Sequence, residues 1–111
     1  MKVAELEGAL LDYWVAKAEG FTNTFETFKA SPTPYSSSQE FGGIIIEREK
    51  ITCVWLGYHW TAGFQFEALS NYPWWHMTWM RDGDSQVQAA MRSYVFKRFG
   101  EEVEDAPHNA G

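Results

Sequence analysis

The alternation of side chains between Ile51 and Met80 constrains the fold more than any other feature of the chain. This stretch contains all but one of the six tryptophans. Tyr58 to Glu67 and Trp74 to Met80 each alternate residue by residue, and the break between them, Leu69 to Pro73, contains turn residues. A period of two places successive side chains on opposite faces of a strand. Together with the apolar run that begins at Ile51, the pattern predicts a three-stranded antiparallel meander.

In the strand predicted over Tyr58 to Glu67, one face is aromatic and apolar and the other is mostly polar. The aromatic face comprises Tyr58, Trp60, Ala62, Phe64 and Phe66. Trp74 and Trp75 are adjacent, so in a strand they point to opposite faces and one of them faces away from the core. Two interpretations stay open. Either a helix layer covers each face of the sheet, or one face exposes an aromatic patch that binds a partner or an identical subunit.

Three helices are predicted around this sheet. The first extends from Val3 to Glu19, where apolar residues recur at three- and four-residue steps, and Gly20 ends it. The last extends to Phe99, between a turn at Arg81 to Asp84 and a stop at Gly100, and either Ser85 or Asp84 can cap its start. Its apolar stripe comprises Val87, Ala90, Met91, Tyr94, Val95 and Phe99.

The middle helix is predicted over Gln39 to Lys50. Gly42-Gly43 disfavours a helix, and the three isoleucines that follow favour a strand. A helix is nevertheless preferred because several larger side chains share one helical face. These are Phe41, Ile44, Ile45 and Arg48.

The segment from Phe21 to Pro34 has no clear period and is predicted to be a long loop. The expected order is therefore α-α-β-β-β-α, an α+β fold in which three helices pack on a three-stranded antiparallel meander. Residues 1–100 are expected to form one domain. Residues 101–111 are predicted to be an acidic, mobile tail, because most of the net charge of -6 lies there. Its acidic residues are Glu101, Glu102, Glu104 and Asp105.

Charge and residue spacing argue against several classes of function. No basic cluster is available for a nucleic-acid backbone, so no nucleic-acid partner is expected. His59, His76 and His108 lack ligand spacing and Cys53 is the only cysteine, so neither a metal nor another cofactor is expected. No run of about 18 apolar residues and no signal peptide is found, which predicts a cytoplasmic protein without membrane contact.

The sequence also lacks a catalytic constellation. It contains no glycine-rich phosphate loop, serine elbow or paired catalytic carboxylates. The alternating charges of Glu47 to Lys50 are typical of a solvated helix end. Asp12, beside Tyr13 and Trp14, could belong to a pocket wall, but an acid on the polar side of an amphipathic helix is the simpler interpretation. We therefore expect a protein that is not an enzyme.

Three stretches carry a resemblance to a known family. They are Leu6 to Gly20, Tyr35-Ser36-Ser37-Ser38 with Gly42 to Glu49, and Gln88 to Val95. In this order and spacing they resemble a family of small phage and prophage proteins whose members carry no assigned activity. A more distant likeness is to phage α/β sandwich domains with a Tyr-Ser-Thr-Asp type segment before a helix. The resemblance implies a phage genome and an accessory role, and it brings no catalytic residue with it.

These observations favour a non-enzymatic phage accessory protein that binds and blocks a host protein in the cytoplasm of the infected bacterium, as counter-defence proteins do. The alternative is a small-ligand or nucleotide sponge, in which a tryptophan stacks on a ring and an arginine meets its phosphate. The predicted binding residues are Trp60, Trp74, Trp75, Trp79, Tyr35, Arg48 and Arg81. Pro73 fits the start of an edge strand, and unpaired edge backbone beside tryptophan predicts a homodimer.

Overall fold

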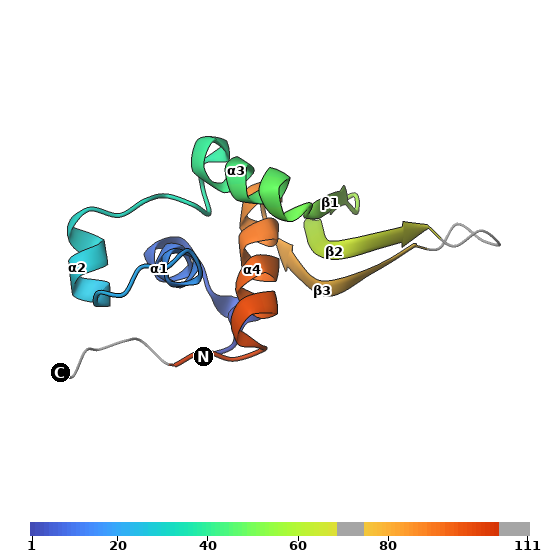
Figure 1. Ribbon diagram of the computed structural model, residues 1–111. Coiled ribbons are helices and arrows are strands. Elements are labelled where there is room, and N and C mark those ends of the chain that lie inside the picture. Colours follow the sequence, from blue (N-terminus) through green and yellow to red (C-terminus); the bar gives the residue numbers. More distant parts are fainter. Residues whose placement is uncertain (69–74, 105–111) are drawn as a thin grey trace.

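A computed structural model of the chain describes residues 1–68 and 75–104 (Figure 1). A short 3-10 helix over Val3–Glu5 precedes all other elements. They follow in the order α1 (Gly8–Ala18), α2 (Phe25–Ala30), α3 (Gln39–Glu49), β1 (Thr52–Trp55), β2 (Trp60–Ala68), β3 (Trp75–Gly83) and α4 (Gln86–Phe99). The three strands are antiparallel in the order β1-β2-β3. The predicted α+β class is confirmed, with one helix more than expected.

Helix α4 is the centre of the fold. It packs against all three strands on one side, while α1 and α3 pack against α4 instead of covering the sheet themselves (Figure 1). The expectation that all helices pack on the sheet is therefore wrong. Most of the apolar stripe predicted for α4 is buried, and Met91 and Val95 have no exposed surface. The predicted cap is confirmed, because the Gln88 N–H donates to Ser85 Oγ at 3.1 Å.

The first predicted helix is interrupted. The 3-10 turn ends at Glu5 and α1 begins at Gly8, whose φ of +58° is a left-handed conformation that glycine adopts without a Cβ clash. Periodic apolar residues on both sides of this break made the two pieces look continuous in the sequence. The predicted end is confirmed, since Gly20 follows the last turn of α1.

The segment predicted to be a long loop contains α2. Thr24 caps this helix, because its Oγ1 accepts the Thr27 N–H at 3.2 Å. Phe25 and Phe28 contact the Tyr13 ring of α1 edge to face, with ring centroids 5.3 and 5.9 Å apart. A helix of six residues is too short to show a helical period, so its stability depends on these contacts with α1.

Helix α3 has the predicted span but a different buried face. Ile45 is buried, whereas Ile44 is 62% exposed and Phe41 is also exposed. The helix approaches α4 through Gly42, where a Cβ atom would overlap Val87 Cγ2 and the carbonyl oxygen of Tyr35. The glycine that argued against a helix in the sequence is therefore what allows the close packing of this one.

The β2–β3 hairpin contains two irregularities that the alternation did not predict. Ala62 pairs with Arg81 and Phe64 with Thr78, which leaves one extra residue on β3, where Trp79 has a φ of 51°. Between Phe64 and the next pairs the extra residue lies on β2, at Gln65, with a φ of 55°. Bulges of this kind bend a strand and redirect its side chains.

The bend separates the hairpin into two parts. Ala62 and Phe64 are buried, but Phe66 is 44% exposed, although the sequence placed all three on one face. The part beyond the bend extends away from the helices (Figure 1). At the other end, β3 continues to Gly83, so the turn predicted at Arg81 to Asp84 begins later than expected.

The segment after α4 pairs with the N-terminus as far as the structure describes it. The Val3 N–H donates to the Glu101 carbonyl and the Val103 N–H donates to the Met1 carbonyl, both at 2.9 Å. Val103 is buried. The first residues of the predicted tail thus belong to the packed body, and residues 105–111 lie outside the described part of the chain.

Candidate functional site

The residues predicted to bind a ligand or partner do not form one site. Tyr35 and Arg48 lie in the helical body, whereas Trp60, Trp75, Trp79 and Arg81 lie on the sheet. Trp74 is outside the described residues. Because these side chains belong to different elements and most of them are engaged in separate contacts, the described residues do not form a single tryptophan face for one ligand.

Arg48 is engaged in a network that joins α1, α3 and α4. Its guanidinium donates to both carboxylate oxygens of Glu19, at 2.9 and 2.7 Å, and to Glu49 at 2.9 Å. The Tyr94 hydroxyl donates to Glu19 at 2.6 Å. Arg48 lowers the pKa of Glu19, while burial and Glu19 raise the pKa of Tyr94. This ion pair connects the helices. The charge of Arg48 is already paired, so it is not available to a ligand.

Two of the predicted sheet residues are largely used for packing. Trp79 meets the Phe64 ring edge to face, with centroids 5.9 Å apart, and Lys97 Nζ lies 5.5 Å from the Trp79 centroid. The Arg81 guanidinium lies 3.7 Å from the Phe96 centroid on α4. Both residues therefore face α4 and help to attach the sheet to it.

Trp60 and Trp75 lie nearer to solvent. Trp60 is half-buried and its ring contacts that of Trp55, which is 53% exposed, and the nearby Tyr58 is 77% exposed. Trp75 is half-buried and stacks on Phe66 at 6.2 Å. Phe66 was not among the predicted binding residues, because regular alternation placed it on the same face as Ala62 and Phe64, which are buried. Only the bulge at Gln65 moves it outward.

We call the described residues beyond the bend, Gln65–Ala68 and Trp75–His76, the β-arm. All four residues of its β2 segment are exposed, so neither face of that segment is covered by the described residues. In the arm Glu67 pairs with His76 and Ala68 with Trp75. The arm is thus a two-stranded ladder that carries a stacked aromatic pair away from the core.

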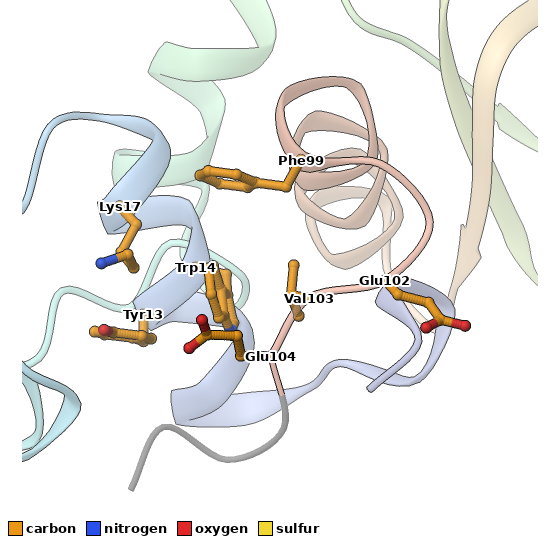
Figure 2. Close-up of a pocket in the computed structure, with 7 residues that line it drawn as sticks. All are labelled: Tyr13, Trp14, Lys17, Phe99, Glu102, Val103 and Glu104. Atoms are coloured by element: carbon orange, nitrogen blue, oxygen red, sulfur yellow. The ribbon is translucent and has the colours of Figure 1, made fainter. Parts of the chain in front are cut away.

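Two clefts of the helical body contain residues that the sequence had singled out. The first, of about 370 Å³, lies between α1 and the segment that follows α4, and we call it the Trp14 cleft (Figure 2). Trp14 is buried, and its indole N–H has no hydrogen-bond partner among residues 1–68 and 75–104. Charges of both signs line this cleft, from Lys17, Glu102 and Glu104. This mixture is not complementary to a single anion or cation.

The second cleft, of about 470 Å³, lies between the beginning of α1, the segment from Pro32 to Ser37 and the beginning of α4. We call it the Asp12 cleft. Asp12 is only 7% exposed, so the expectation that it lies on a solvated helix face is wrong. Its Oδ1 accepts the Ser36 N–H at 2.7 Å. Burial raises the pKa of Asp12, although the hydrogen bonds from Ser36 oppose this rise.

Sequence reasoning found the residues of this cleft only in part. It noted that Asp12 could belong to a pocket wall and identified Ser36-Ser37 as part of a family-like segment. Asp12 and Ser36 are brought together by a hydrogen bond between residues 24 positions apart. No local sequence pattern indicates such a bond. Within residues 1–68 and 75–104, no group of three His, Cys, Asp or Glu side chains converges as a metal site.

Among the helices that the structure describes, none combines the length and apolar character that a bilayer crossing requires. No curated protein matches the chain in a sequence comparison. The family described as Bacteriophage P22, NinX matches residues 2–98. This match covers nearly all of the body, including the three stretches that carried the resemblance to small phage proteins. The chain therefore belongs to the bacteriophage P22 NinX family and is a phage accessory protein.

Proposed function

We propose that this phage protein is a non-enzymatic binder that occupies a host protein, in the manner of counter-defence inhibitors, and that the β-arm makes the contact. The observation that carries the proposal is the exposure of Gln65–Ala68 together with the stacked pair Phe66 and Trp75. Exposed aromatic residues anchor many protein interfaces. Here they lie on a projection that adds nothing to the core.

The edge position of β3 supports the same proposal. In the order β1-β2-β3 the last strand has a neighbour on one side only. Unpaired backbone along such an edge can accept a strand from another chain, and stacked aromatic residues beside it add apolar contact area. A host protein or a second copy of this chain could use the same edge, and the homodimer predicted from the sequence remains a proposal of this kind.

The tryptophan sponge is supported less well. It requires a tryptophan face and a free arginine at one place, but Arg48 is bonded to Glu19 and Arg81 lies over Phe96. Trp79 packs beside Phe64. A nucleotide would have to disrupt these contacts, whereas a protein partner can use Phe66 and Trp75 as they stand.

The test is affinity purification of the tagged protein from the host under conditions in which it is expressed at natural levels. We expect one host protein to copurify at close to equal molar amounts. Replacing Phe66 and Trp75 by serine should remove it, because loss of two aromatic anchors weakens an interface by roughly 2 kcal/mol or more.

A matched control comes from α3. Phe41 and Ile44 are also exposed apolar residues, and serine at both positions removes similar surface without touching the β-arm. This control should retain the partner. The proposal is wrong if the parent retains no stoichiometric host protein, or if the α3 variant loses the partner as completely as the β-arm variant does.

A further inference from the structure

The Asp12 cleft contains a buried charge without a balancing cation. Asp12 lies on α1 with only 7% of its surface exposed, and Ser36 beside it is equally buried. Ser36 provides hydrogen bonds to the carboxylate but no charge. Among the described residues that line the cleft, none is lysine, arginine or histidine. A buried carboxylate is normally paired, because removing it from water is costly.

Arg92 of α4 interacts electrostatically with Asp84, but its hydrogen-bond donors are engaged elsewhere. Arg92 donates through Nε to the Leu6 carbonyl at 2.7 Å and through Nη1 to the Asp82 carbonyl at 2.8 Å. It is not part of the cleft lining. The structure therefore provides the anionic half of an ion pair and leaves space beside it.

The rest of the lining determines what can fill that space. A second carboxylate, Asp84, lies at the exposed rim, and the hydroxyls of Ser37 and Ser85 add acceptors. Pro32 and Pro34 provide apolar walls. A volume of about 470 Å³ lies within the range of small-ligand pockets, which run from roughly 300 to 1,000 Å³. Two acids, several acceptors and proline walls are complementary to a cationic head on a short aliphatic body.

We propose that the Asp12 cleft is a binding site for an organic cation, an ammonium or guanidinium group, with Asp12 as its buried anionic partner and Asp84 at the rim. The cation can belong to a free small amine or to a lysine or arginine side chain of a peptide. This site is distinct from the β-arm, which extends away from the helices (Figure 1), and does not depend on the function proposed there.

An anion is the competing occupant, because the cleft adjoins the beginning of α4. That helix start is already capped, since Ser85 Oγ accepts the Gln88 N–H. Two carboxylates in the lining also repel an anion. Inorganic phosphate is therefore a suitable negative probe.

The experiment is an NMR titration of the 15N-labelled full-length protein at about 0.15 M salt, where unspecific surface attraction is screened. The probes are 1,4-diaminobutane, N-acetylarginine methylamide and inorganic phosphate. We expect saturable shifts of the Asp12, Ser36 and Ser37 amide signals with at least one cation. Response to the diamine alone indicates a free amine as the natural ligand, and response to the arginine probe alone indicates a peptide side chain.

Variants identify the partner charge. Asp12→Asn keeps the size of the side chain and an oxygen that can accept the Ser36 N–H, so the fold is expected to persist while cation affinity falls at least tenfold. Asp84→Asn should weaken binding by a smaller factor. Glu40→Gln removes the same charge from exposed α3 and should leave the affinity unchanged.

The proposal is overturned if neither cation gives saturable shifts at these amides, if phosphate binds in their place, or if Glu40→Gln weakens binding as much as Asp12→Asn does. If Asp12→Asn does not fold, unchanged affinity in Asp84→Asn also overturns it, and a clear loss there supports it.

Discussion

Helix α4 and the β-arm are connected by the rest of β3, yet they differ strongly in packing. On α4, Met91 and Val95 are without exposed surface and are enclosed by α1, α3 and the sheet. In the β-arm, all residues from Gln65 to Ala68 are exposed. The difference shows that aromatic content does not by itself identify a core. The aromatic residues of the body stabilise the fold, whereas those of the arm are available to a partner.

The comparison is tested most directly by truncating one side chain in each region. Met91→Ala on α4 should lower the free energy of unfolding by roughly 2 to 5 kcal/mol, because it removes buried apolar surface and leaves a cavity. Phe66→Ala in the β-arm should lower it by less than about 1 kcal/mol, since it removes a half-exposed contact. Urea unfolding of the two variants provides the measurement. Equal losses would show that the arm is part of the cooperative core.

A smaller effect is expected for the ionic network of the body. The Arg48 guanidinium lowers the pKa of Glu19. The stability that Glu19 provides is therefore present above its unfolded pKa and is lost as the pH falls through its lower folded pKa. Glu19→Gln should cost about 1 kcal/mol at pH 7, a modest figure because Arg48 is partly exposed, and almost nothing at the acid end.

The measurement is the free energy of unfolding from pH 3 to pH 7 for the parent and the variant. Glu26→Gln is a suitable control, since that carboxylate forms an exposed pair with Lys29 on α2 and should contribute little. A difference between Glu19→Gln and the parent that does not change with pH would contradict the assignment.

The contribution of Asp12 to the free energy of unfolding should change with pH in the opposite direction. Burial raises its pKa, so its contribution to stability is fully present below the unfolded pKa and is lost as the pH rises through the folded pKa. Asp12→Asn removes the cost of burying the charge and should stabilise the protein slightly at pH 7, with no gain at low pH. A variant that is less stable than the parent at pH 7 would show that the carboxylate charge is needed for folding.

The β-arm is expected to affect assembly far more than stability. If the edge strand β3 joins two copies, Trp75→Lys should shift the protein from dimer to monomer, because lysine on an edge strand opposes pairing between chains. The free energy of unfolding of the monomer should change little. Sedimentation equilibrium at matched concentrations tests this, with Ile44→Lys on α3 as the control. A monomeric parent would exclude the dimer.

Local signals in the sequence were sufficient for much of the body. The Ser85 cap and the stop at Gly100 defined α4, and the alternation around Trp60 defined β2. The stretches around Tyr35 and Gln88 carried the resemblance that the match over residues 2–98 confirmed. These features could be predicted because capping, strand periodicity and family motifs depend on residues that are close together in the chain.

The candidate sites could not be predicted in the same way. Phe66 is exposed because Gln65 adopts a positive φ, and Asp12 is buried because Ser36 folds over it. Helix α2 depends on its contacts with Tyr13. Each of these outcomes requires contacts between residues far apart in sequence or a register set by the partner strand. The sequence by itself therefore determined the strands, the last helix and the family. Only the tertiary structure decided that α2 forms and which side chains lie in the core, in the Asp12 cleft and on the β-arm, because burial is a property of the packed chain.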